Sequence, residues 1–207
     1  MSGLMDQFRC PTGRRGRLVA AQMNRGHTPL TLWGLTHVNI KADYIILDVG
    51  CGGGKTVSRL AQQVRSGKVF GIDYSADMVK YSREVNEKLI AENHVEIVEA
   101  SVEKTGFPDG FFDLVTAVET YYFWPSLSDA LREIRRVLKS GGKLFMVNEM
   151  VKDGVYEIKH AKMIEKTHVH LIPLEEIKDT MLSVGFMDIQ VFIKAGSPWN
   201  AILAKKQ

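Results

Sequence analysis

The sequence predicts an α/β protein with a doubly wound, mostly parallel sheet of seven strands that ends in an antiparallel hairpin. Three observations favour this fold. From residue 44 onward, short runs rich in Ile, Leu and Val alternate with segments of helical periodicity. A glycine-rich loop follows the first of these runs directly, within Asp48–Thr56. Near the end of the chain, two strand-like runs are separated only by Gly196, Ser197 and Pro198, so they pair as antiparallel neighbours.

The first half of the sheet follows from four apolar runs. The predicted strands are Tyr44–Val49, Lys68–Ile72, Val95–Ala100 and Phe112–Val118. Apolar residues at helical spacing predict a helix over residues 57–64. They predict a second helix that begins after an N-cap at Ser75 and continues to Leu89.

The second half alternates in the same way until the final hairpin. A helix with one apolar stripe is predicted from Leu127 to Leu138, and the sequence Ser140-Gly141-Gly142 is expected to end it. The remaining elements are a strand, a helix and the two strands of the hairpin: Lys143–Asn148, Leu174–Val184, Met187–Lys194 and Trp199–Ala204.

Composition and length restrict the class of protein. The chain has 207 residues, of which 45% are hydrophobic and 25% charged, so it is most simply one domain with a sizeable core. No apolar run approaches the roughly 20 residues needed to cross a bilayer, and the first residues lack the apolar centre of a signal peptide. We therefore expect a cytoplasmic protein without membrane insertion. The mild formal charge of +3 does not indicate a nucleic-acid-binding face.

Two small groups of residues near the start of the chain carry no specific signal. Cys10 and Cys51 are too few and too far apart to indicate a disulfide framework, so both are expected to be free thiols. Arg14, Arg15 and Arg17 are interpreted as a solvated arm.

Two segments fall outside the predicted sheet. Residues 1–40 are expected to form an N-terminal lid, with its helix over Arg25–Leu35, and residues 41–207 the main domain. Within that domain, residues 150–172 follow the fifth predicted strand and are expected to form a cap. Both segments would lie over the carboxyl ends of the strands, where open α/β sheets bind ligands.

The glycine-rich loop has the partial signatures of two common nucleotide loops. A phosphate loop that ends in Gly54-Lys55-Thr56 requires its first glycine at position 49, which is Val49. A dinucleotide loop that begins with Gly50 and Gly52 requires its third glycine at position 55, which is Lys55. The ribose-binding acid of the dinucleotide signature is nevertheless present as Asp73. The pattern therefore favours an adenosine ligand that has no pyrophosphate.

Four segments in register resemble the class I S-adenosylmethionine-dependent methyltransferases. The segments are ILDVGCGGG (Ile46–Gly54), VFGIDYSADMV (Val69–Val79), EASVEKTGFPDGFFDLVTAVET (Glu99–Thr120) and LREIRRVLKSGGKLFMVNE (Leu131–Glu149). The resemblance covers residues 44–204, and it is to the small-molecule branch whose domain also occurs in enzymes of ubiquinone and menaquinone biosynthesis. It implies a Rossmann-like fold with a terminal β-hairpin, and S-adenosyl-L-methionine as cofactor.

The resemblance implies a set of cofactor-binding residues. Asp48 would lie near the methionyl ammonium, Asp73 would accept hydrogen bonds from the ribose hydroxyls, and Tyr74 with Met78 would cover the adenine. The expected set is Asn24, Asp48, Gly50, Cys51, Gly52, Asp73, Tyr74, Met78, Ser101, Val102, Glu103 and Val118. For Cys51 and Val102 mainly the backbone is expected to take part.

Methyl transfer requires a base only when the acceptor starts out protonated. The candidates are Glu119 and His27, and less so His168 and His170. Residues 120–124, TYYFW, follow the fourth predicted strand, so Tyr122 is a further catalytic candidate, and one of its first two tyrosines is expected to face the site. His160 belongs with His168 and His170 to a cluster without recognisable ligand spacing, so no metal is expected.

Two functions agree with these observations. The first is methyl transfer to a small-molecule acceptor, with S-adenosylhomocysteine as product. The second is a cofactor-binding regulatory or assembly protein that keeps the fold without turnover. The expected partner is a small-molecule acceptor rather than a nucleic acid, and a homodimer stays open.

Overall fold

A computed structural model describes residues 13–150, 152–167 and 169–207 of the chain. The predictions for Cys10 and His168, and those for the side chains of Arg14 and Arg15, fall outside the described part.

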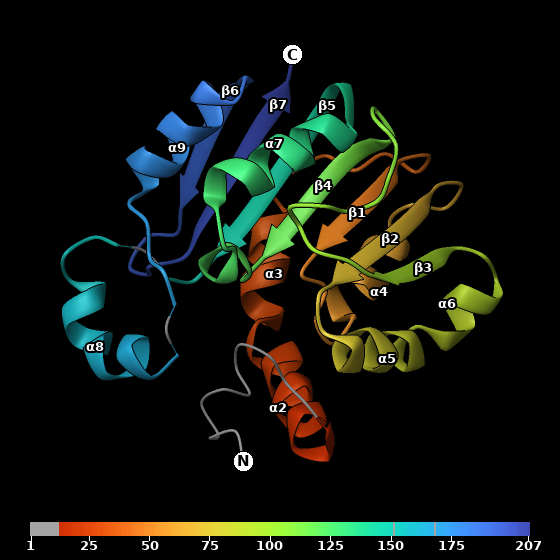
Figure 1. Cartoon of the computed structure of the whole chain (residues 1–207), viewed down its shortest axis with the longest axis horizontal. Coiled ribbons are helices and arrows are strands. Elements are labelled where there is room, and N and C mark those ends of the chain that lie inside the picture. Colours follow the sequence, from red (N-terminus) through yellow and green to blue (C-terminus); the bar gives the residue numbers. More distant parts are fainter. Residues whose placement is uncertain (1–12, 151, 168) are drawn as a thin grey trace.

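The protein contains one seven-stranded sheet in the order β3-β2-β1-β4-β5-β7-β6 (Figure 1). Strands β1 to β5 run parallel, and β7 pairs antiparallel with both β5 and β6. The strands are β1 (Ile45–Val49), β2 (Lys68–Asp73), β3 (Val95–Glu99), β4 (Phe112–Val118), β5 (Leu138–Asn148), β6 (Phe186–Ile193) and β7 (Asn200–Lys206). The predicted fold class and the terminal hairpin are confirmed. The order reverses between β1 and β4, which is where open α/β sheets form a ligand crevice.

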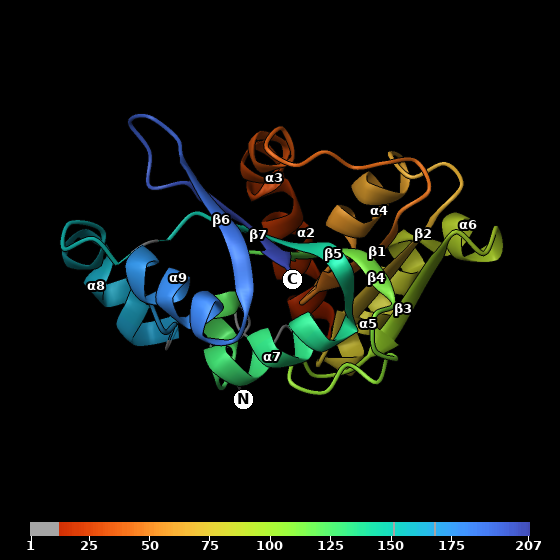
Figure 2. The same ribbon diagram turned by 90° about the horizontal axis from the view of Figure 1, so that it is seen from above.

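Helices cover both faces of this sheet. They are α2 (Gly13–Gly26), α3 (Thr28–Leu35), α4 (Lys55–Ala61), α5 (Ala76–Val85), α6 (Glu87–Ala91), α7 (Leu127–Val137), α8 (Tyr156–Thr167) and α9 (Leu174–Ser183), with a 3₁₀ turn η1 (Tyr121–Phe123). Figure 2 shows α3 and α4 on one face and α7 and α9 on the other. Each face has its own buried apolar cluster, as a doubly wound sheet requires. In the described part of the chain, no helix is both long and apolar enough to span a bilayer.

Two predicted boundaries differ from the structure. The helix expected from Ser75 to Leu89 breaks at Asn86, which is 1% exposed. Its side chain accepts a hydrogen bond from the Ser58 hydroxyl (2.7 Å) and donates one to the Gly54 carbonyl (3.1 Å), so it braces the glycine-rich loop. The N-cap at Ser75 is confirmed, because its hydroxyl accepts from the Met78 amide.

The second difference concerns Ser140-Gly141-Gly142, which does not end a helix. Helix α7 ends at Val137, and β5 begins at the next residue. The glycines lie inside β5, where the pairing register with β4 shifts and Gly141 takes a φ of +75°. A glycine pair therefore marks an irregularity in the strand here rather than a helix terminus.

The described part of the segment expected to form a lid, residues 13–40, contains the helices α2 and α3, which are held to the main domain separately. The Gly13 amide donates to the Asp77 carboxylate of α5 (3.0 Å), and Arg17 forms an ion pair with Glu84. Helix α3 packs on β5, with Gly34 against the side chain of Val147. In Figure 1, α2 lies beyond the carboxyl ends of β1 and β4. The junction of the two helices therefore lies at the ligand-binding edge of the sheet.

The close approach of α3 to β5 generates a stability prediction. A Cβ added at Gly34 would lie 2.6 Å from Cγ2 of Val147, whose side chain is fully buried and β-branched. Gly34→Ala should lower the free energy of unfolding by about 1–3 kcal/mol through overpacking. Gly26→Ala is the matched control, because its added Cβ meets nothing within 4 Å. Urea denaturation measures both variants, and equal stability would contradict this packing.

Candidate active site

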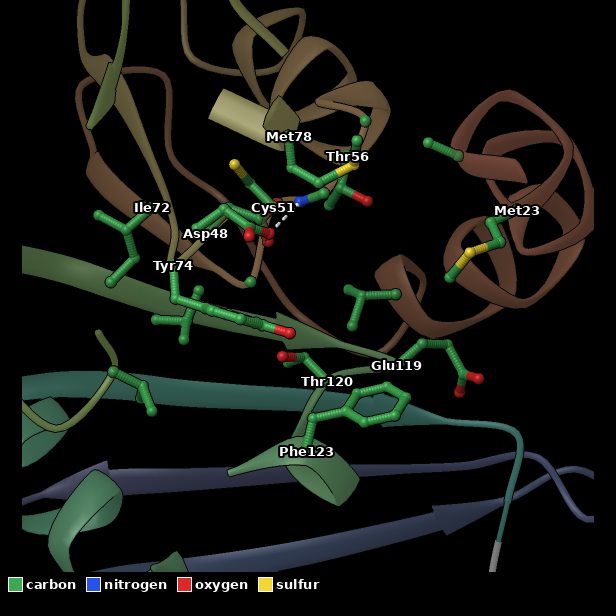
Figure 3. A pocket seen from close by; sticks show the side chains of 18 of the residues that line it. Met23, Asp48, Cys51, Thr56, Ile72, Tyr74, Met78, Glu119, Thr120 and Phe123 are labelled. Carbon is green, nitrogen blue, oxygen red and sulfur yellow. Dashed lines mark hydrogen bonds between the residues drawn. The ribbon is translucent and has the colours of Figure 1, made fainter. Parts of the chain in front are cut away.

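A cavity of about 300 Å³ lies at the carboxyl ends of β1, β2 and β4, with α2 and α3 on its opposite side (Figure 3). The predicted site residues that line it are Asn24, His27, Asp48, Gly50, Cys51, Gly52, Asp73, Tyr74, Met78, Ser101, Val102, Val118 and Glu119. Residues that are far apart in the sequence thus meet in one place.

The glycine-rich loop forms the floor of this cavity through left-handed backbone. Gly50 takes a φ of +65°, and a Cβ at this position would lie 2.2 Å from the Thr120 hydroxyl oxygen. A Cβ at Gly53 would lie 2.3 Å from Nδ2 of Asn24, which donates to the Gly53 carbonyl. Only glycine permits both approaches. The loop thereby packs against Asn24 of α2 and against Thr120, which lies just after β4.

Asp73 connects β2 to the loop and to the start of α5. One carboxylate oxygen accepts from the Gly52 amide and the other from the Ser75 amide, both at 2.9 Å. Burial raises the pKa of Asp73, and these two hydrogen bonds oppose the effect. Each oxygen keeps a further lone pair, so the carboxylate can also accept from a ligand's hydroxyl groups.

Asp48, the penultimate residue of β1, is almost completely buried, at 2% exposure. Burial raises the pKa of this carboxyl to about 7, the Thr116 hydroxyl at 2.6 Å opposes the rise, and nearby Asp73 adds to it. A buried carboxyl without a cationic partner takes up a proton near neutral pH, and a cation placed beside it would favour its ionised form.

Arg59 of α4 was not predicted as a site residue. In the described part of the chain it is the one Lys or Arg among the residues lining the cavity, and its guanidinium donates to the Thr28 hydroxyl at 2.5 Å. Arginine suits carboxylate recognition, so Arg59 can pair with the carboxylate of a ligand beside the glycine-rich loop. Its sequence position carries no signal, because only the folded chain brings α4 and α3 together.

Glu119 follows β4 and occupies left-handed backbone, with a φ of +59°. Its carboxylate oxygen Oε1 accepts from the Tyr122 hydroxyl at 2.7 Å and from the Glu149 amide. The other oxygen, Oε2, lies 3.9 Å from Nε2 of His27. Burial raises the pKa of Glu119 to about 8 and lowers that of His27, whose imidazole is therefore neutral. Figure 3 places Glu119 beside Phe123, on the side of the cavity near Met23.

Two predicted residues do not line the cavity. The Glu103 carboxylate accepts from the Ser126 amide at 2.9 Å, so it caps the start of α7. Tyr122 is 2% exposed and reaches the site only through its hydrogen bond to Glu119. The expectation that Tyr121 or Tyr122 faces the site is wrong, because the 3₁₀ turn at this point buries both and brings Phe123 and Trp124 to the cavity.

Of the other predicted histidines, His160 and His170 do not line the cavity. His160 stacks on Tyr156 with ring centroids 4.2 Å apart, and the backbone amide of His170 donates to the Tyr122 carbonyl. Among the described residues, the one group of three side chains that meets the spacing of a metal site is His27, Glu119 and Glu149. Glu149 was missed, although it follows β5 as Glu119 follows β4.

Comparison with known proteins identifies the family. Residues 47–146 match the model of the Methyltransferase domain family. The chain is 28% identical over 148 residues to a sarcosine/dimethylglycine N-methyltransferase of Halorhodospira halochloris, covering 71% of this chain and 53% of the relative. It is 28% identical over 161 residues to a malonyl-[acyl-carrier protein] O-methyltransferase of Methylovorus sp., covering 73% and 54%. The chain thus spans about half the length of these curated relatives.

A solved structure shares the fold over the whole chain. Phosphoethanolamine N-methyltransferase 2 of Haemonchus contortus superposes with a TM-score of 0.81 at 18% identity, covering 100% of this chain and 60% of that one. By sequence and fold, the chain belongs to the class I S-adenosylmethionine-dependent methyltransferases. The cofactor of this class is S-adenosylmethionine. The narrower resemblance to the quinone-biosynthesis branch stays a prediction.

The raised pKa of Glu119 predicts a specific dependence of stability on pH. The pKa of Glu119 in the folded protein is about 8, above the ordinary value of 4.5, so the folded state binds this proton more tightly than the unfolded state does. The stability that the wild type has relative to Glu119→Gln is therefore complete below pH 4.5 and is lost as the pH rises through 8. The free energy of unfolding of the wild type should therefore fall by about 4 kcal/mol relative to this variant between pH 5 and pH 8.5.

Urea denaturation of both proteins at several pH values measures this difference. Asp48 is present in both proteins, so its own titration cancels in the comparison. A difference that does not change with pH would show that Glu119 is ionised throughout and would contradict the burial described above.

Proposed function

We propose that this protein transfers a methyl group from S-adenosylmethionine to a small-molecule acceptor and releases S-adenosylhomocysteine. The observation that carries the proposal is the charge of the cavity. Asp48, Asp73 and Glu119 bring three buried carboxyl groups to the ends of three neighbouring strands, and among the described lining residues the one Lys or Arg that faces them is Arg59. S-adenosylmethionine carries an ammonium, a sulfonium and one carboxylate, so its charges complement those of the cavity.

The cavity residues fit the parts of this cofactor in order. Asp73 can accept from the ribose diol while it holds the loop, and Tyr74 with Met78 can cover the adenine. Asp48 can pair with the methionyl ammonium and Arg59 with the methionyl carboxylate. These assignments put the transferable methyl group at the remaining end of the cavity, which is lined by His27, Glu119, Phe123 and Trp124.

When bound, the sulfonium supplies an electrophilic methyl carbon: the acceptor's lone pair forms the new bond to it, and the electron pair of the broken C–S bond stays on sulfur. The residues at this end of the cavity align the acceptor and exclude water. The ring faces of Phe123 and Trp124 can attract positive charge. His27 has a neutral imidazole, which can take a proton from the acceptor, and Glu119 lies close enough to stabilise the resulting imidazolium.

The relatives support a small acceptor without identifying it. Two are named for small molecules, namely sarcosine with dimethylglycine and phosphoethanolamine, and the third is named for malonyl-[acyl-carrier protein]. We therefore propose that the acceptor is a small molecule and that the residues of the site determine its chemical class. A regulatory or assembly protein without turnover is the alternative, and it is not favoured because His27 and Glu119 form a proton-accepting pair in the cavity.

Transfer of label tests the proposed function. The protein is incubated with methyl-labelled S-adenosylmethionine and a broad metabolite extract, and S-adenosylhomocysteine is quantified. We expect product that depends on the extract, about 100-fold less of it with His27→Ala, and S-adenosylhomocysteine binding by this variant within threefold of the wild type. Asp73→Ala should abolish cofactor binding itself.

Each contrary result has a definite meaning. Cofactor binding without extract-dependent product would favour the regulatory alternative. Absence of cofactor binding by the wild type would contradict the proposed function as a whole. Asp179→Ala, an exposed acid on α9, is the control for unspecific effects of removing a carboxylate.

A further inference from the structure

Three side chains from different elements converge beside the end of the cavity where the methyl group would be transferred: His27 and Glu119 line the cavity, and Glu149 lies next to them outside its lining. His27 lies at the junction of α2 and α3, Glu119 after β4, and Glu149 after β5. One ring nitrogen and one oxygen of each carboxylate lie within 4.8 Å of one another. These residues, here called the His27–Glu119–Glu149 group, join the N-terminal lid to two strands of the sheet.

The group contains two carboxyl groups, those of Glu119 and Glu149, that no Lys or Arg of the described residues pairs with. Glu119 is 7% exposed, and its Oε1 is already used by the Tyr122 hydroxyl and the Glu149 amide. Its Oε2 faces His27 at 3.9 Å, which is beyond hydrogen-bond distance. This oxygen and the imidazole are therefore free to bind a ligand placed between them.

The spacing distinguishes the ligands that such a group can hold. Three acceptors arranged tetrahedrally around an amine nitrogen, each at about 2.9 Å, lie about 4.7 Å apart. Adjacent ligands of a first-row metal, with bonds of about 2.1 Å, lie only about 3.0–3.4 Å apart. The 3.9 Å separation and the limit of 4.8 Å leave room for a nitrogen with its hydrogens, whereas a metal would require His27 and Glu119 to move together.

We propose that the His27–Glu119–Glu149 group is the acceptor-binding site and that it selects an amine as the methyl acceptor. This inference rests on the proposed function and deepens it. An ammonium group offsets the two carboxylates, which a neutral alcohol cannot do, and the rings of Phe123 and Trp124 line the same end of the cavity.

The group also explains how the amine becomes a nucleophile. A protonated amine has no lone pair, so one N–H proton must leave before its nitrogen can attack. Nε2 of His27 receives this proton, and the electron pair left on nitrogen forms the new N–C bond. The imidazolium then lies within 4.8 Å of a carboxylate oxygen of both Glu119 and Glu149. The side chain of His27 is 29% exposed, so the proton can pass on to solvent.

Binding to the product-loaded protein tests this inference without turnover. With S-adenosylhomocysteine at saturation, n-butylamine and n-butanol are titrated at pH 8 by calorimetry. We expect n-butylamine to bind at least tenfold more tightly than n-butanol. Glu149→Gln should remove this preference and leave S-adenosylhomocysteine affinity within twofold, and Glu165→Gln, an exposed acid on α8, should keep the preference.

Three results would overturn the inference. Equal binding of the alcohol and the amine would show that charge does not select the acceptor. An unchanged preference in Glu149→Gln would place the amine elsewhere. Micromolar binding of Mn²⁺ that competes with n-butylamine, followed by electron paramagnetic resonance, would make the group a divalent-cation site. If S-adenosylhomocysteine itself does not bind, the proposed function fails and this inference falls with it; in the first three cases only the inference fails.

Discussion

The burial of carboxyl groups at the ends of neighbouring parallel strands is the constraint on which the site depends. Asp48 is the penultimate residue of β1, Asp73 ends β2, and Glu119 directly follows β4. Parallel pairing brings these ends to one edge, and the covering helices exclude water from it. The carboxyl groups are thereby held away from solvent, which raises the pKa of each. A cationic ligand offsets the free-energy cost of ionising these buried carboxyl groups, so the fold favours a positively charged ligand.

The N-terminal helices turn this edge of the sheet into an enclosed cavity. Helix α3 is fixed by the contact of Gly34 with Val147, and α2 by its contacts with α5. Between these helices, His27 is held opposite Glu119, and Asn24 contacts the glycine-rich loop at Gly53. The residues proposed to bind the cofactor and the acceptor thus depend on the same two helices, so a shift of α2 or α3 would affect both proposed sites.

Much of the fold, and many of the residues that line the cavity, could be predicted from the sequence, because the signals there are local. Apolar runs predict the strands, and the N-cap at Ser75 predicts the start of a helix, from patterns that each extend over only a few residues. The break at Asn86 and the glycines inside β5 could not be predicted, because they depend on tertiary hydrogen bonds and on strand register. Arg59 likewise enters the site only through folding. Glu149 could have been predicted, because it directly follows β5 as Glu119 directly follows β4.

Proton release on cofactor binding tests the central claim most directly. Near pH 7.5, carboxyl groups with pKa values of about 7 and 8 are partly protonated, and a bound cation should ionise them. Calorimetry in two buffers of different ionisation enthalpy counts the protons. The account predicts release of protons with S-adenosylmethionine, and fewer with S-adenosylhomocysteine, which lacks the sulfonium charge. Tight binding without any proton release would contradict it.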